Sequence, residues 1–162
     1  MPVTTGSGGS GWPYVLAGGF AAGAIDIIYA CAYWKLKAGV PAQRILQSVA
    51  AGLLGRSASI QGGLRTAILG LALHFFIALT MAAVYFVVAR RWALLWQRPI
   101  PMGALYGLWL YIAMRFIVVP LSKAGGGGGS ADTLWVVLSV IVHMVGIGVP
   151  IALATSYAIK GR

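Results

Sequence analysis

Hydrophobic residues along the chain fall into four long runs, separated by stretches that hold most of the charged residues. A helix needs about 20 mostly apolar residues to cross the hydrocarbon core of a bilayer. The segments that meet this requirement cover residues 14–34, 66–88, 103–121 and 134–157. Trp and Tyr mark most of their ends, and Lys or Arg follow, as in helices that end at the membrane–water interface. The pattern predicts an all-α integral membrane protein, a bundle of four transmembrane helices.

A shorter amphipathic segment, residues 41–55, follows the first of these runs. Its apolar residues recur at helical spacing on one side, and polar or basic residues take the other side. The segment is too short to cross a bilayer, so we expect a helix that lies in the membrane interface. Residues 14–158 then form one membrane domain, preceded by a flexible tail at 1–13 and interrupted by a flexible Gly-rich loop at 123–131.

Composition supports a chain whose main solvent is lipid. Of the 162 residues, 60% are hydrophobic and 9% are charged, whereas soluble domains carry about 25% charged residues. A soluble enzyme and a disordered chain are therefore excluded, and Cys31 as the single cysteine excludes a disulfide scaffold. The net charge of +10 would suggest nucleic acid in a soluble protein. Here the basic residues lie at the ends of apolar runs, where they contact lipid phosphates, so we expect no nucleic-acid partner.

Basic residues also bear on the orientation of the chain, because an even number of spans places both termini on one side. That side carries Arg90, Arg91, Arg98, Lys160 and Arg162, and the other carries Lys35, Lys37, Arg44, Arg56, Arg65 and Lys123. The short loop after the second span is the denser basic cluster, and basic loops tend to stay in the cytoplasm. We therefore expect both termini in the cytoplasm.

Ionisable residues interrupt the apolar runs once in each span. They are Asp26, His74, Arg115 and His143. A charge at the bilayer centre costs about 2.5 kcal/mol or more, so each such group needs a partner or a wet cavity. Because successive spans alternate in direction, all these positions are displaced toward the same leaflet. The sequence therefore predicts a polar layer inside the membrane.

Small residues share the helix faces that carry these groups. Small side chains let helices approach closely, so such faces point at protein rather than at lipid. The glycines that we expect to serve helix packing in this way are Gly19, Gly23, Gly103 and Gly107. The polar groups would then meet inside the bundle.

Two interpretations of the polar layer follow. In the structural one, Asp26 and Arg115 form an intramembrane ion pair. Each histidine then donates a hydrogen bond to a backbone carbonyl, to Ser139 or to Tyr111. In the functional one, the cluster binds or relays a solute, since ionisable groups inside membranes commonly line proton or ion routes.

Several short segments between residues 62 and 158 follow one another in a characteristic order. They are LHFFIA at 73–78, YFVVA at 85–89, GALYG at 103–107, VVPL at 118–121 and VHM at 142–144. This order resembles that of uncharacterised small bacterial inner-membrane proteins of the YagU-like kind. The resemblance implies a multi-pass protein of the bacterial inner membrane. That family has no assigned activity, so the resemblance implies no site residue.

These observations favour a non-enzymatic membrane protein that serves transport or an ion pathway, because nothing in the sequence resembles a nucleophile with its base. One alternative is an accessory structural subunit of a larger membrane complex. Another is a redox protein in which His74 and His143 ligate haem b. A third is a metalloprotein in which His74, His143 and Asp26 hold a divalent metal. We expect no cofactor. The expected partners are the lipid bilayer and further copies of the chain or subunits of a larger complex, because four helices form only a thin wall around a pore.

Overall fold

The structure is a computed structural model that describes residues 11–125 and 132–161. Within these residues the chain is helical apart from short connections, and it contains no strand. The all-α fold predicted from the sequence is therefore confirmed. The predicted tail at 1–13 and the predicted Gly-rich loop at 123–131 lie for the most part outside the described residues.

Four helices among the described residues are long and apolar enough to cross a membrane. The first two are α1 (Trp12–Ala38) and α4 (Gly63–Ala89). The third runs from Pro99 to Leu121 and the fourth from Thr133 to Lys160. These helices extend beyond the predicted runs at most of their ends, and the added residues include the basic Lys35, Lys37 and Arg65. The chain is a multi-pass membrane protein.

The third and fourth spans each change their winding part-way along. The third consists of α6 (Pro99–Ala113), the π-helix η1 (Met114–Val118) and α7 (Val119–Leu121). The fourth consists of α8 (Thr133–Ile141), the π-helix η2 (Val142–Gly148) and α9 (Val149–Lys160). Each π-helix ends shortly before a proline, Pro120 or Pro150. Proline lacks an N–H and its ring crowds the carbonyl one turn earlier. A local widening of the helix accommodates both effects.

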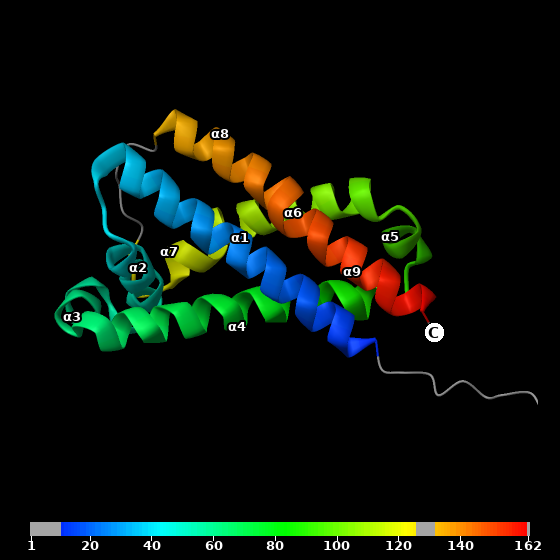
Figure 1. The fold of residues 1–162 in the computed structure, drawn as a ribbon, viewed down its shortest axis with the longest axis horizontal. Helices are drawn as coiled ribbons and strands as arrows, with labels where there is room; N and C mark the ends of the chain where they lie inside the picture. Colours follow the sequence, from blue (N-terminus) through cyan, green and yellow to red (C-terminus); the bar gives the residue numbers. More distant parts are fainter. Residues whose placement is uncertain (1–10, 126–131, 162) are drawn as a thin grey trace, which may run out of the picture.

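Short helices connect the spans. They are α2 (Ala42–Leu54), α3 (Arg56–Gln61) and α5 (Ala93–Gln97). The amphipathic helix predicted at 41–55 is α2, which packs against α4 at the end of the bundle opposite α5 (Figure 1). Gln47 of α2 is buried, and its Nε2 donates to the carbonyl oxygen of Gly63 at 2.9 Å. This bond fixes α2 to the beginning of α4.

The spans are arranged around α1, which packs against α4 on one side and against η2 and α9 on the other (Figure 1). α6 packs in turn against η2 and α9. α4 and α6 meet near α5, where the Tyr106 hydroxyl donates to the Met81 carbonyl at 2.8 Å. The Tyr85 and Tyr106 rings lie 4.8 Å apart at the same place. This contact closes the bundle at the end where α5 lies.

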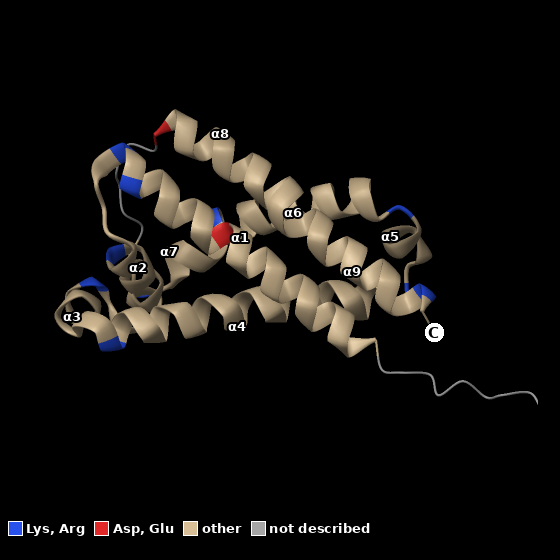
Figure 2. Cartoon of the chain, viewed as in Figure 1, with Lys and Arg blue, Asp and Glu red and all other residues tan. Residues whose placement is uncertain are grey.

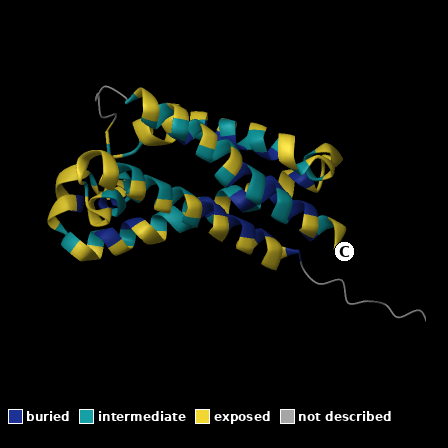
Figure 3. Ribbon diagram, turned by 45° about the horizontal axis from the view of Figure 1, so that its top comes forward, coloured by how far each residue is buried: buried dark blue, intermediate teal, exposed yellow. Residues whose placement is uncertain are grey.

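The closed half of the bundle holds the chain's C-terminus and the largest buried side chains. Phe86, Leu110 and Ile151 are each less than 2% exposed, and buried segments gather toward the end marked C (Figure 3). Helices in lipid associate through close packing rather than through a hydrophobic driving force. A core of this kind therefore requires that the backbones approach closely.

Glycine provides this close approach at the positions where the sequence suggested it. A Cβ on Gly19 would lie 2.9 Å from the Cβ of Ala82, and one on Gly23 would lie 3.0 Å from that of Ala78. A Cβ on Gly103 would lie 2.7 Å from the carbonyl oxygen of Gly148. A Cβ on Gly107 would collide with the carbonyl oxygen of His143. Gly19 and Gly23 thus lie at the α1–α4 contact, and Gly103 and Gly107 lie at the contact between the third and fourth spans.

Candidate functional site

A cavity with a volume of about 530 Å³ lies in the other half of the bundle, between all four spans. The ionisable residues of the predicted polar layer all line it: Asp26, His74, Arg115 and His143. Each comes from a different span, so the cavity lies where the polar positions of the spans converge. Most of the remaining wall is apolar. A few polar groups on an apolar wall are typical of a small-molecule site.

Asp26 and Arg115 face the cavity from α1 and η1. Asp26 is half-buried and Arg115 is exposed, and most other charged residues lie near the two ends of the bundle (Figure 2). Among the described residues, one ion pair has its nitrogen and oxygen atoms within 4.0 Å of each other, and it joins Lys37 to Asp132. The predicted direct ion pair between Asp26 and Arg115 is therefore not formed. Both charges line the same cavity.

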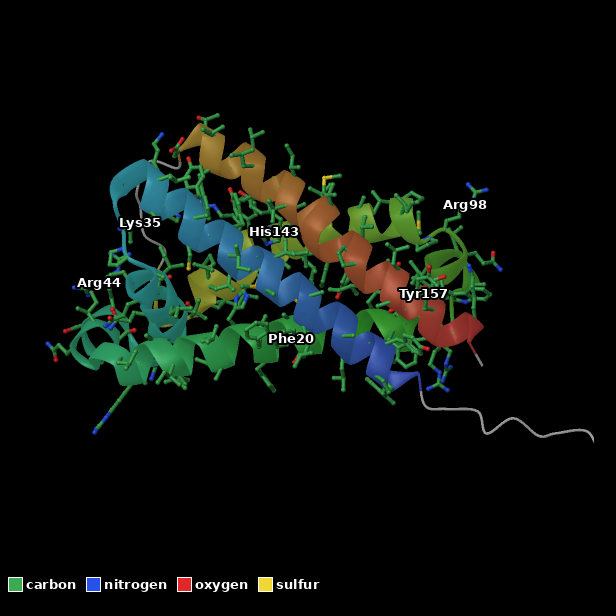
Figure 4. The ribbon with its side chains drawn as sticks, in the orientation of Figure 1. Phe20, Lys35, Arg44, Arg98, His143 and Tyr157 are labelled. Atoms are coloured by element: carbon green, nitrogen blue, oxygen red, sulfur yellow. The ribbon has the colours of Figure 1, made fainter. Side chains whose placement is uncertain are left out.

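Both histidines donate a hydrogen bond to a backbone carbonyl. His74 Nε2 lies 2.8 Å from the Gly23 carbonyl oxygen on α1, and His143 Nδ1 lies 2.8 Å from the Ser139 carbonyl oxygen one turn earlier. The His143 ring also meets the edge of Tyr111, with 5.4 Å between centroids, and it lies inside the bundle (Figure 4). These bonds fix both rings. In the neutral rings the remaining nitrogen is an acceptor.

A pair of hydroxyl groups joins α1 to α8 beside this layer. The Tyr29 hydroxyl lies 3.3 Å from Ser139 Oγ, and Ser139 is buried against the cavity. The sequence suggested Ser139 and Tyr111 as partners for the histidines, and Tyr111 and the Ser139 carbonyl do contact His143. Tyr29 was not foreseen, because an aromatic residue late in a span is equally suited to the lipid interface.

The edge of the cavity carries a network that sequence reasoning missed. The Asp132 carboxylate accepts hydrogen bonds from the Tyr33 hydroxyl at 2.7 Å and from the Leu134 N–H at 3.1 Å, and pairs with Lys37 Nζ at 2.9 Å. The Lys37 ammonium, and then the Tyr33 hydroxyl, lower the pKa of Asp132 to about 2. Because Asp132 precedes α8 while Tyr33 and Lys37 end α1, the network ties those two helix ends together.

Aromatic rings surround the same edge. Trp135 of α8 stacks on Tyr29 with 5.1 Å between centroids and lies 5.3 Å from Trp34 of α1. Trp34, Trp135 and Asp132 all line the cavity. Trp34 lies near the end of α1 and Trp135 near the beginning of α8, so the cavity extends from near one end of the bundle toward its middle.

The inner end of the cavity is closed by the packed core. Ala22, Leu110 and Ile147 line the cavity and also belong to the buried cluster of the closed half. Each of them is 6% exposed or less. Packed side chains therefore close the cavity toward the end of the bundle that holds Lys160, and toward the other end the cavity reaches Trp34 and Trp135.

The arrangement of possible ligands bears on the metal and haem alternatives. The described residues contain no group of three or more His, Cys, Asp or Glu side chains placed to hold a metal ion. The metal alternative built on His74, His143 and Asp26 thus finds no support in the geometry. Ligation of haem b by the two histidines stays a prediction.

Comparisons of this chain with protein families, with curated proteins and with solved structures found no significant match.

Proposed function

We propose that this membrane protein binds a small charged solute in the intramembrane cavity and passes it across the bilayer, alone or as part of a transport system. The observation that carries this proposal is the convergence of ionisable residues from all four spans on one cavity. Such residues are costly inside a membrane and commonly mark substrate and ion pathways. A purely structural role would favour a direct ion pair between Asp26 and Arg115, and these residues do not form one.

The size and wall of the cavity suit a small solute. A volume of about 530 Å³ falls within the range of about 300–1,000 Å³ that is usual for small-molecule sites. The apolar wall excludes water from a bound solute, while Asp26, Arg115 and the free histidine nitrogens provide charge and hydrogen bonds. In a low-dielectric cavity such contacts are stronger than in water.

A transport cycle requires a state in which the binding site is accessible from one side of the membrane. The solute enters past Trp34 and Trp135, and the core at Ala22, Leu110 and Ile147 blocks its exit. Release on the other side then needs a second state in which this core opens. The glycine contacts between α1 and α4, and between the third and fourth spans, are the surfaces on which the helices would shift.

We place the protein in the bacterial inner membrane, with both termini in the cytoplasm. The resemblance to YagU-like proteins and the basic loop between the second and third spans support this placement. The end of the cavity that the packed core closes then faces the cytoplasm, and the end at Trp34 and Trp135 faces the outside.

Labelling of cavity residues in sealed vesicles tests whether the cavity admits water and solutes. In a Cys31→Ser background, Ala30→Cys places a thiol on the cavity wall, and Ile28→Cys places one on the outer face of the same helix, at a residue that is 65% exposed. We expect a membrane-impermeant cationic thiol reagent to label Ala30→Cys but not Ile28→Cys, because thiols react as thiolates and lipid covers the outer face. Ala152→Cys in the packed core should stay unlabelled. Equal labelling of Ala30→Cys and Ala152→Cys would contradict an accessible cavity.

Transport itself is tested with proteoliposomes incubated in a mixture of small charged metabolites. We expect at least one solute to accumulate relative to empty liposomes, and Asp26→Asn and Arg115→Gln to reduce its accumulation at least about tenfold, since each removes one charge from the site. Arg98→Gln, a change at the far end of the bundle, is the matched control and should transport normally. Equal solute content in protein-containing and empty liposomes argues against a carrier that acts alone.

A further inference from the structure

The two charges on the cavity wall have opposite sign and no partner. Asp26 and Arg115 form no hydrogen bond or ion pair with any of the residues that the structure describes. They lie on different spans, α1 and η1, and both line the cavity. A charged group inside a membrane needs a partner or a wet cavity. Each of these groups is therefore available to a ligand group of opposite sign.

The other polar groups of the cavity add no further unpaired charge. His74 and His143 each donate to a backbone carbonyl, and Ser139 and Tyr111 are neutral. Asp132 at the edge is already neutralised by Lys37 at 2.9 Å. The cavity thus presents one negative and one positive charge on a wall that is otherwise mostly apolar and aromatic.

We propose that the solute is a small zwitterion, with an ammonium group at Asp26, a carboxylate at Arg115 and an apolar body against the wall. This inference rests on the proposed function and names its substrate class. The guanidinium group binds carboxylates in a planar, bidentate manner. A ligand with only a cation leaves Arg115 unpaired, and a ligand with only an anion leaves Asp26 unpaired. The site therefore selects against both.

Calorimetric titration of the purified protein with a matched set of probes tests this assignment. Phenylalanine, phenethylamine and 3-phenylpropanoate share one apolar body and differ in carrying both charges, the cation alone or the anion alone. We expect phenylalanine to bind at least about tenfold more tightly than either of the others, since it alone makes both charge-assisted contacts. Equal or tighter binding of phenethylamine or 3-phenylpropanoate would overturn the proposal, and so would failure of all three to bind.

Two variants identify which charge recognises which group. Asp26→Asn should remove the preference for phenylalanine over 3-phenylpropanoate, and Arg115→Gln should remove the preference over phenethylamine. Arg98→Gln should leave all three affinities unchanged. Where a variant does not fold, the three probes on the unaltered protein decide alone. Accessibility of Ala30→Cys is independent of these probes, so an accessible cavity that ignores zwitterions refutes the substrate class and leaves the proposed function standing.

Discussion

Most polar side chains inside this bundle are satisfied by backbone carbonyls. His74 donates to the Gly23 carbonyl, and Tyr85 donates to the Leu95 carbonyl at 2.9 Å. Ser156 donates to the Trp96 carbonyl at 2.7 Å. Such bonds suit a membrane protein, because an unsatisfied polar group in hydrocarbon costs several kcal/mol and a carbonyl has a second lone pair to offer. The carboxylate of Asp26 differs from these groups, because it has no hydrogen-bond partner among the described residues.

Asp132 provides a prediction at the residue scale. Its folded-state pKa of about 2 lies below the ordinary value of 3.8, chiefly because of Lys37 and then Tyr33. A depressed folded-state pKa means that the carboxylate stabilises the fold above the unfolded pKa, and that this contribution is lost as pH falls through the folded pKa. We expect the thermal midpoint of the protein in detergent to fall between about pH 5 and about pH 2.

The matched variant for this experiment is Asp132→Asn. It keeps the shape of the side chain but cannot titrate, so it should lack this part of the pH dependence. Lys37→Gln should weaken the same part, because it removes the largest cause of the shift. An unchanged pH dependence in Asp132→Asn would show that the network at the cavity edge does not stabilise the fold.

At the scale of helices, the apolar pattern was sufficient to predict which elements exist. A run of about 20 apolar residues can satisfy its backbone in lipid only as a helix, which is why all four predicted spans are present. The ends were less predictable, because they depend on local backbone conformation. α1 continues past Lys37 until Gly39, whose φ of 65° stops the helix.

The two π-helices could not be derived from the pattern. Pro120 and Pro150 are visible in the sequence, but a proline can end, kink or widen a helix. Here η1 and η2 each precede a proline and carry Arg115 and His143 to the cavity wall. A proline a few residues after an intramembrane ionisable residue was the available signal.

Helix contacts provide a prediction at this scale. A methyl group added by Gly107→Ala would collide with the carbonyl oxygen of His143, so the third and fourth spans would have to separate. We expect a loss of about 1–3 kcal/mol, as for other overpacked sites. Gly52→Ala on α2 is the control, because its Cβ would meet its nearest neighbour at 3.6 Å, an ordinary contact. Denaturant unfolding in detergent measures both, and equal stability of the two variants would show that the contact is not tight.

At the scale of the whole molecule, the sequence was sufficient to predict that the polar groups meet inside the bundle, but not whether they touch. Alternating spans of known length place Asp26, His74, Arg115 and His143 at one depth, since helix rise is fixed. Whether two such groups touch depends on how far apart the helices pack. The apolar pattern does not fix that distance, because low amphipathicity leaves the rotation of a span in lipid weakly defined. The structural interpretation expected the two charges to pair, whereas in the structure they line one cavity without forming an ion pair.

The number of crossings provides a prediction for the whole chain. In a Cys31→Ser background, single cysteines at Arg98 and Lys160 test one end of the bundle, and cysteines at Arg56 and Lys123 test the other. All four residues are exposed, so differences in labelling report the side of the membrane. We expect an impermeant reagent to label the first pair only in inside-out vesicles and the second pair only in right-side-out vesicles, because both termini are expected in the cytoplasm.

The possible results of this labelling separate two claims. Labelling of Arg98→Cys and Lys160→Cys from opposite sides would mean that only one of the last two spans crosses the membrane, and the four-span bundle would fail. If the first pair of cysteines were labelled only in right-side-out vesicles and the second pair only in inside-out vesicles, the four spans would stand but the chain would have the opposite orientation. The end of the cavity at Trp34 and Trp135 would then face the cytoplasm, because it lies away from Lys160 in the bundle. The direction from which a solute enters therefore follows from the orientation of the chain.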